Sequence, residues 1–143
     1  MTISAVELHL LAEHMGVQLR RHTGGCPGWY DHHRRVISTR RGQSIGQYKS
    51  VLAHELGHAA HGDTPTGNGH FDQRQERRAD EYAARLLISP VEFESAAVWH
   101  HGHLPAIADE LEVTQHILKT WQTLHESPAS PAPGNMPALN SNN

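Results

Sequence analysis

The sequence predicts a single α+β domain from two kinds of apolar pattern. Helical spacing dominates residues 3–15, 44–61, 72–90 and 107–121, whereas apolar residues alternate in short stretches between residues 17 and 39. Helices combined with a few short strands make an α+β fold. We therefore expect a small sheet packed on a helix, followed by further helices.

The N-terminal part is expected to supply one helix and the sheet. Residues 17–20 alternate as a strand does, and residues 28–31 with 35–39 can form a hairpin that turns near His32. These strands predict a small antiparallel sheet next to the following helix. A helix is expected before them over residues 3–15, where four apolar residues recur at helical spacing: Ile3, Val6, Leu10 and Leu11.

A longer helix is predicted over residues 44–61. Ser44 followed by Gln47 has the spacing of a capping box, and Gly62 stands where a helix would end. The apolar residues between these signals recur at helical spacing: Val51, Leu52, Leu56 and Ala60.

This helix carries the pattern H-E-x-x-H as His54-Glu55-Leu56-Gly57-His58. Two histidines four residues apart lie about 40° apart around a helix and roughly 6 Å apart along it, so both imidazoles can bind one metal ion. Glu55 is rotated by about 100° from His54, which leaves it beside the ion, where it can take a proton from the attacking water. The motif therefore predicts two zinc ligands and a general base.

The pentapeptide alone is weak evidence, because the chain has 14 histidines among its 143 residues. About one such sequence in ten would contain the pattern by chance. A zinc site also needs a third protein ligand, with the fourth position left for water. The metzincin arrangement would place a histidine where this chain has Thr64, so the third ligand must come from elsewhere.

The next helix, predicted over residues 72–90, offers that ligand. Asp72 and Gln75 have the spacing of an N-terminal cap, and Ser89 with Pro90 stops the helix. The apolar stripe between these signals has helical spacing: Ala79, Tyr82, Ala83, Leu86 and Leu87.

Glu76 extends this stripe toward the N-terminus, so its carboxylate is expected to point into the protein, where it needs a partner or a metal. Asp80, one turn later, could accept a hydrogen bond from the free ring nitrogen of a ligating histidine. Asp63, His70 and Asp72 remain alternative third ligands. In the plainer interpretation, Glu76 is a solvated first-turn carboxylate favoured by the helix dipole.

The two helices together resemble the ImmA/IrrE family of zinc-dependent endopeptidases. That family pairs an HELGH helix with a second helix of the form E-x-x-A-(D or N)-x-(aromatic)-A-x-x-L-L-x-P, which here runs from Glu76 to Pro90. Ser89 moves the proline one place along, which puts no candidate catalytic residue in doubt. The resemblance extends more weakly over residues 5–125.

The resemblance implies a zincin-like domain of gluzincin type, in which His54, His58 and Glu76 hold Zn²⁺ and Glu55 moves the proton. Proteins of this family look like regulators that cleave helix-turn-helix repressors in phages, mobile elements and bacterial stress responses. The expected partner is therefore a protein substrate, in particular a repressor.

Residues 104–125 carry an alternative hypothesis, because residues 107–121 are similar to a helix-turn-helix unit with Thr114 as the cap of its second helix. A DNA-binding element needs cations for the phosphates, yet only Lys119 stands against three acidic residues of this stretch: Asp109, Glu110 and Glu112. Two packed helices that close the fold are the preferred interpretation, and no direct nucleic-acid binding is expected. The alternative function is a non-catalytic or DNA-binding regulator.

The substrate cleft is expected beside the edge strand of the sheet, which would bind an extended peptide by adding it as a further strand. Four arginines would either border the cleft and favour acidic substrate segments or remain solvated: Arg34, Arg35, Arg40 and Arg41. Four residues are candidate donors to the transition state, and none can be assigned: Tyr30, Tyr48, His61 and Tyr82.

Composition indicates one small cytoplasmic domain. Residues 1–126 suffice for one modest core, and the Pro- and Asn-rich residues 127–143 are expected to be disordered. No apolar run approaches the roughly 18 residues of a membrane span, and no signal peptide is recognisable, so neither membrane insertion nor secretion is expected. Cys26 is the single cysteine, which excludes an intrachain disulfide.

Overall fold

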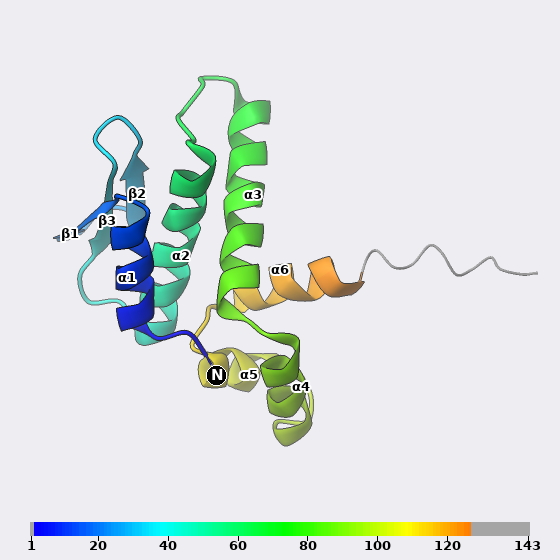
Figure 1. Ribbon diagram of the computed structural model, residues 1–143. Coiled ribbons are helices and arrows are strands. Elements are labelled where there is room, and N and C mark those ends of the chain that lie inside the picture. The colour runs from blue at the N-terminus through cyan, green and yellow to red at the C-terminus, as the bar shows by residue number, and fades with distance from the viewer. Residues whose placement is uncertain (1, 127–143) are drawn as a thin grey trace, which may run out of the picture.

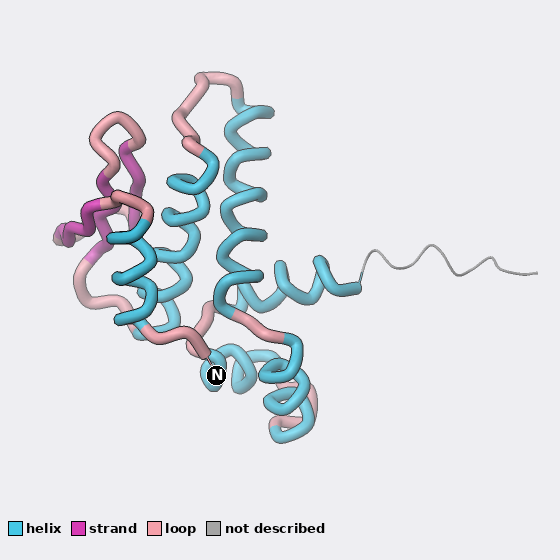
Figure 2. The backbone as a smooth tube through the Cα atoms, viewed as in Figure 1, coloured by secondary structure: helices cyan, strands magenta, loops and turns pink. Residues whose placement is uncertain are grey.

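The computed structural model describes residues 2–126, which form six helices and a three-stranded sheet (Figures 1 and 2). This is the α+β class that the sequence predicts. The expected tail, residues 127–143, lies outside the described residues, so the division of the chain at residue 126 stays a prediction. The elements in chain order are α1 (Ala5–His14), β1 (Gln18–His22), β2 (Gly28–Asp31), β3 (Val36–Arg40), α2 (Ile45–His61), α3 (Gly69–Leu87), α4 (Pro90–Trp99), α5 (Leu104–Leu111) and α6 (Gln115–Glu126).

Helix α2 is the centre of the arrangement. The sheet and α1 pack on one side of it, and α3 runs alongside it on the other (Figure 1). Helices α4 and α5 pack on each other at one end of the α2 and α3 pair, and α6 packs on α3. The two helices that carry the candidate site residues therefore lie next to each other, and the sheet borders the first of them.

The sheet is mixed, which corrects the expected antiparallel sheet. Strands β2 and β3 form the predicted hairpin, with Tyr30 opposite Ile37 in antiparallel register. Strand β1 pairs in parallel with β3, with Leu19 opposite Ile37, and the strand order is β1-β3-β2. Alternation along a strand shows which residues share a face, but not the direction of the neighbouring strand. This order leaves β2 as an edge strand beside α2.

Only part of the apolar pattern expected in the N-terminal helix packs on the core, where Ile3 and Leu11 are partly buried. Leu8 and Ala12 are fully buried, whereas Val6 and Leu10 are 65% and 58% exposed. Two apolar stripes share this short helix, and its packing against α2 and β1 buries the stripe through Leu8 and Ala12. Helical spacing alone could not decide between them.

The ends of α2 are those predicted. Ser44 accepts a hydrogen bond from the backbone N–H of Gln47, and the Gln47 side chain accepts one from the backbone N–H of Ser44. Gly62 ends the helix in the left-handed conformation, with φ of 64°, which glycine adopts at little cost. The motif helix therefore carries its start and stop signals in the local sequence.

Helix α3 begins at Gly69, so the prediction that Asp72 caps it was wrong. The side chain of Asn68 accepts hydrogen bonds from the backbone N–H groups of His70 and Phe71 and is the actual cap. Asp72 lies in the first turn instead, and its carboxylate accepts hydrogen bonds from the backbone N–H and the hydroxyl of Thr66.

Helix α4 has no counterpart in the sequence-based prediction. Ser89 and Pro90 end α3 as expected, but they also start α4: Ser89 accepts a hydrogen bond from the backbone N–H of Glu92, and Pro90 is the first helical residue. Proline suits that position because its missing N–H would have no partner there. The same two residues therefore end α3 and begin α4.

Helices α5 and α6 form the predicted helical pair. Glu112 joins them in the left-handed conformation, with φ of 57°, and Thr114 accepts a hydrogen bond from the backbone N–H of Ile117, as expected of a cap. The turn is fastened to α2, because the backbone N–H of Thr114 donates to Ser50 and the ammonium group of Lys49 lies 2.7 Å from a Glu112 carboxylate oxygen. The pair thus closes the fold against the motif helix.

The close approach of α2 and α3 depends on Gly57, inside the H-E-x-x-H motif. A Cβ atom on Gly57 would lie 3.0 Å from the Cα of Ala79, 3.1 Å from its carbonyl oxygen and 3.1 Å from the Cβ of Tyr82. Two of these three contacts are with backbone atoms, which cannot rotate away. Gly57 and Ala79 therefore set the distance between the two helices that carry the candidate ligands.

We expect Gly57→Ala to push α3 away from α2. Overpacking at such a contact costs about 1–3 kcal/mol, of which the better helix propensity of alanine offsets about 1 kcal/mol. The free energy of unfolding, measured in urea, should fall. Gly69→Ala is the matched control, because nothing lies within 4 Å of its added Cβ. A Gly57→Ala variant as stable as Gly69→Ala would contradict the close contact.

A second test concerns the buried ammonium group of Lys49, which is fully buried while the Glu112 side chain is 44% exposed. Glu112→Gly removes the partner of a buried charge, and we expect a loss of about 3 kcal/mol in the free energy of unfolding although glycine relieves the left-handed backbone. Lys49→Met removes the charge itself and should be nearly neutral, because a similar apolar side chain fills the space. The proposed pairing fails if Glu112→Gly is as stable as wild type.

Candidate metal centre

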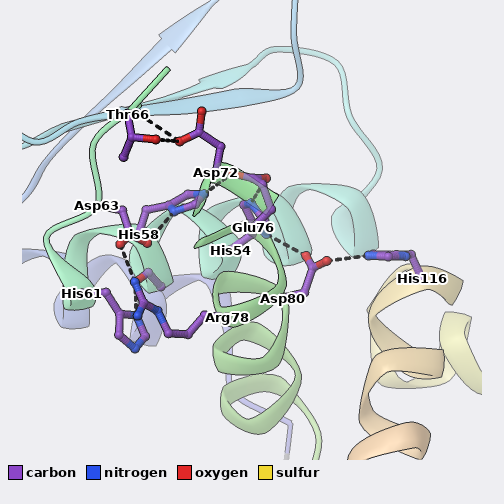
Figure 3. A network of polar contacts seen from close by, with 11 residues as sticks. His54, His58, His61, Asp63, Thr66, Asp72, Glu76, Arg78, Asp80 and His116 are labelled. Carbon is purple, nitrogen blue, oxygen red and sulfur yellow. Dashed lines mark hydrogen bonds and ion pairs between the residues drawn. The ribbon is translucent and has the colours of Figure 1, made fainter. Parts of the chain in front are cut away.

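Both motif histidines turn their rings toward the groove between α2 and α3 (Figure 3). Their side chains are 17% exposed for His54 and 10% exposed for His58, and the ring centroids lie 4.8 Å apart at nearly a right angle. The Nε2 atoms of both rings face α3. This is the arrangement that the four-residue spacing predicts.

Glu76 on α3 meets both rings. Its Oε1 lies 3.0 Å from Nε2 of His54, and its Oε2 lies 2.8 Å from Nε2 of His58. Ligand atoms of these three residues all lie within 4.8 Å of one another, and no other group of three such side chains among residues 2–126 comes as close. The side chain of Glu76 is nevertheless 61% exposed, so the expectation that it points into the interior was wrong. It lies at the open edge of the helix contact, one turn before Ala79.

Asp80 accepts a hydrogen bond from the other nitrogen of His54, and its role behind a metal ligand stays a prediction. Its Oδ1 lies 2.7 Å from Nδ1 of His54, and its Oδ2 lies 2.8 Å from Nε2 of His116 on α6 (Figure 3). A carboxylate only accepts, so Nδ1 of His54 carries the proton of this bond. Burial raises the pKa of Asp80, but the hydrogen bonds from His54 and His116 outweigh it, and the net pKa lies below its usual value.

Asp63 accepts the corresponding hydrogen bond from Nδ1 of His58, a contact that the sequence did not predict. Its Oδ2 lies 2.9 Å from Nδ1 of His58, and its Oδ1 accepts a hydrogen bond of 2.7 Å from Arg78. The left-handed turn at Gly62 brings Asp63 back over the end of α2, where its backbone N–H donates to the carbonyl of His58. A usable signal was present: an acidic residue directly after the C-terminal glycine of the motif helix.

These contacts show that the side chains fit a cation. Nδ1 of each histidine donates to a carboxylate, so in a neutral ring Nε2 has a lone pair and no proton. That lone pair faces a second carboxylate, on Glu76, and two acceptors repel each other unless a proton or a metal ion lies between them. Two imidazole nitrogens and a carboxylate are also a donor set typical of zinc.

The pKa of His54 shows the same attraction for positive charge. Burial lowers it, but the hydrogen bond to Asp80 and the negative charges of Glu55, Asp80 and Glu76 outweigh burial, so the net pKa lies above the usual value. A metal ion and a proton compete for the same nitrogen, and surroundings that favour one favour the other.

Glu55 lies beside this group without taking part in it. The residue is only 7% exposed, and within residues 2–126 its carboxylate has no hydrogen-bond or ion-pair partner. Burial raises its pKa; the charges of His54 and His58 lower it and that of Glu76 raises it, and the net pKa is above the usual value. A buried carboxylate without a partner is costly and is typical of functional sites.

Two cavities meet at Glu55 and Glu76. The first, of about 350 Å³, extends between β2 and the loop that joins α2 to α3, and includes Trp29, Tyr30 and Asp72. The second, of about 300 Å³, extends toward the start of α6. Its lining includes four residues outside the metal group: Pro27, Val51, His116 and Ile117. Together they form a cleft that crosses the candidate centre.

Gly28 permits this cleft, which sequence reasoning did not foresee. It lines both cavities, and a Cβ atom on it would lie 2.5 Å from Val51 and 3.5 Å from Glu55. Only a residue without a side chain lets the edge strand β2 come this close to the candidate base. A glycine at the start of a strand does not by itself predict such a close approach to another element.

The alternative third ligands are engaged elsewhere. Asp63 contacts the far nitrogen of His58, Asp72 is bonded to Thr66, and His70 lies 3.1 Å from a guanidinium nitrogen of Arg74. Among the described residues, none of the three joins the group of converging ligand atoms.

The four arginines do not line either cavity, so of the two alternatives left open by the sequence, the one that placed them at the border of the cleft was wrong. The guanidinium group of Arg35 donates to the carbonyl of Met15 and the hydroxyl of Tyr30, and that of Arg40 donates to the carbonyl of Gly25. Arg41 reaches Thr23, and Arg34 pairs with Asp31 inside the hairpin turn. They support loops and the N-terminal helix instead.

Of the candidate donors to the transition state, only Tyr30 lines a cavity beside Glu55. Its hydroxyl accepts from Arg35 and lies 2.8 Å from Nδ1 of His32. Tyr48 is bonded to His9, and His61 to the carbonyl of Gly57. The described hydrogen bonds therefore favour none of the four for that role.

Comparison with protein families adds independent evidence. The family model of the IrrE N-terminal-like domain, Peptidase M78, matches residues 12–119, which is most of the chain. The chain belongs to this family. The resemblance to the ImmA/IrrE family is thereby confirmed. No curated protein matched the chain.

Membership supports a peptidase of the metallopeptidase type, and a peptidase implies a protein substrate. The convergence of His54, His58 and Glu76 agrees with a bound metal. Across residues 2–126, no helix combines the length and the apolar character that a membrane span requires.

The zinc affinities of two variants should show how much Glu76 and Asp80 each contribute to metal binding. We expect Glu76→Ala to lose the metal, because two ligands remain, and Asp80→Ala to weaken it by roughly 10- to 100-fold. Competition with a chromogenic chelator measures both. Gln75→Ala is the control, because it changes the neighbouring residue on α3 without touching the histidines. Unchanged affinity in Glu76→Ala would exclude the two-helix site.

Proposed function

We propose that the protein is a zinc-dependent endopeptidase with a gluzincin-type site. His54, His58 and Glu76 are the zinc ligands, Glu55 is the general base, and Asp80 orients His54. One observation supports the proposal most directly. The three converging ligand atoms lie in the same cleft as the buried carboxylate of Glu55, which has no hydrogen-bond or ion-pair partner among the described residues.

A bound zinc ion supplies Lewis acidity, which polarises a scissile carbonyl and makes water a better nucleophile near neutral pH. The chain's own residues prepare the ligands for it. Asp80 and Asp63 accept from Nδ1 of His54 and His58, which fixes both rings with Nε2 facing α3. No rearrangement of either ring is then needed when the metal binds.

Glu55 is placed to move a proton. Its carboxylate opens onto both cavities, so it can accept a proton from the attacking water and deliver it to the nitrogen of the leaving amine. Nothing among residues 2–126 competes for it by hydrogen bonding. General acid and base catalysis of this kind typically contributes 10²- to 10⁴-fold to a rate.

The substrate would bind as an extended strand along β2. That strand pairs with β3 on one side only, and its first three residues line the cavity next to Glu55: Gly28, Trp29 and Tyr30. An edge strand offers backbone hydrogen bonds to any extended peptide, and the neighbouring cavities then select side chains. The close approach of Gly28 to Glu55 would place such a peptide over the base.

The substrate that we propose is a helix-turn-helix repressor of a phage, a mobile element or a stress response. The proposal rests on the family to which the chain belongs. Cleavage of a repressor is a regulatory act, and it would take place in the cytoplasm, where repressors bind DNA.

A DNA-binding role for residues 104–125 has less support. Three residues at the turn contact the core: Glu112 pairs with Lys49, the backbone N–H of Thr114 donates to Ser50, and His116 bonds to Asp80. The start of α6 would have to enter a DNA groove, yet it faces α2 and α3. With Lys119 as its one lysine or arginine, the segment also lacks charge for phosphate contacts.

The variant Glu55→Gln tests the enzyme. It keeps the shape of the side chain but cannot take a proton, so it should retain one zinc per chain and lose hydrolysis by about 100-fold or more. Cleavage of a peptide library, followed by mass spectrometry, measures activity, and elemental analysis measures zinc. Wild-type cleavage rates in Glu55→Gln would refute the assigned base; a wild-type protein with neither zinc nor cleavage would refute the function.

A further inference from the structure

The two candidate histidine ligands are each held by a chain of two hydrogen bonds. His58 is bonded to Asp63, and the second oxygen of Asp63 is bonded to Arg78. His54 is bonded to Asp80, and the second oxygen of Asp80 is bonded to His116 (Figure 3). In both chains a carboxylate orients the ring, and a further donor occupies the other oxygen of that carboxylate.

The donor behind Asp80 comes from a distant part of the chain. Asp63 and Arg78 lie within 15 residues of each other, whereas His116 is 36 residues from Asp80 and belongs to the first turn of α6. Three features place that turn: the Lys49 and Glu112 pair, the bond from Thr114 to Ser50, and the packing of α6 on α3. His116 is therefore held against α3 by contacts that do not involve its own side chain.

The bond from His116 has a clear mechanical effect. Asp80 is half-buried, with 21% of its side chain exposed, and a carboxylate bonded through one oxygen alone can rotate about its last single bond. With both oxygens engaged, the plane of the carboxylate is fixed, and so is the direction from which it accepts the proton on Nδ1 of His54. That direction sets the ring orientation and hence the position of Nε2, the candidate ligand atom.

We propose that His116 is a positioning residue of the metal centre, acting through Asp80 on His54. The inference deepens the proposed function and rests on it, because it concerns the same three ligands. It also gives α6 a role: the last described helix supplies the outer end of the chain of bonds that orients one ligand.

The test compares His116→Ala with His116→Gln. Alanine removes the donor, and we expect the dissociation constant for zinc to rise by about three- to tenfold, less than for Asp80→Ala, because the change is one bond further from the ligand. Glutamine reaches to about the same distance with an amide N–H, and should restore affinity to within about twofold of wild type. His125→Ala is the matched control, because it removes the same residue type from α6 at a site where its ring contacts Trp121.

A second measurement requires neither bound metal nor catalytic activity. In the metal-free protein, ¹⁵N spectra of the imidazole rings report which nitrogen carries the proton. At a pH where the ring of His54 is neutral, wild type and His116→Gln should show a larger share of the tautomer protonated at Nδ1 than His116→Ala does. Urea unfolding of each metal-free variant shows whether α6 still packs, since loss of a partly exposed contact should leave stability nearly unchanged.

The outcomes separate the possibilities. Equal zinc affinity and equal tautomer populations in His116→Ala and wild type would overturn the proposal, and so would equal losses in the alanine and glutamine variants. Unchanged zinc affinity with slower peptide cleavage would also overturn it, because His116 would then contact the substrate in the second cavity. A wild-type protein that does not retain zinc would refute the proposed function itself, whatever the variants do.

Discussion

The contact between α2 and α3 at Gly57 is the constraint on which the candidate site depends. His54 and His58 come from one helix, and Glu76 and Asp80 come from the other, so the distance between the helices sets the distance between ligand atoms. Metal ligands tolerate displacements of only about 0.2 Å. The Cα and carbonyl oxygen of Ala79 lie against Gly57, and backbone atoms cannot rotate away, so this contact fixes the distance between the helices. Gly57, the residue just before the second motif histidine, is therefore part of the candidate site, although it binds nothing.

The site also concentrates negative charge. Four carboxylates surround two imidazole rings: Glu55, Asp63, Glu76 and Asp80. Arg78 pairs with Asp63, and His116 forms a hydrogen bond with Asp80, whereas Glu55 and Glu76 face the cleft and have no lysine or arginine partner among the described residues. Such an arrangement lowers the stability of the metal-free protein and favours a bound cation. Folding and metal binding are therefore linked. The same imbalance agrees with the role proposed for Glu55.

The last described helix, α6, completes the cleft instead of standing apart from it. The start of α6 forms one wall of the second cavity, and its turn is fastened to α2 by a fully buried ammonium group. Strand β2 forms the opposite border, and Gly28 lets it approach Glu55, the candidate base. The cleft is thus built from strand β2, from the two helices that carry the candidate ligands and from the last described helix.

The sequence by itself determined the parts of the site that depend on helix geometry. The four-residue spacing of His54 and His58, the capping box at Ser44 and the three- and four-residue steps from Glu76 to Ala79 and Asp80 follow from 3.6 residues per turn, and the structure reproduces all of them. Three further features were predictable because residues close together in the chain signal them: the hairpin, the pairing of the last two helices and the family.

Only the tertiary structure decided which groups meet across the chain. The parallel pairing of β1 with β3, the buried face of α1, the bond from Asp63 to His58 and the bond from His116 to Asp80 depend on how separate elements pack. Local spacing gives the side on which a residue lies, but it does not say which element will face that side. Glu76 is the clearest example: its helix position was predictable, while its exposure and its contact with both rings depend on where the contact between α2 and α3 ends.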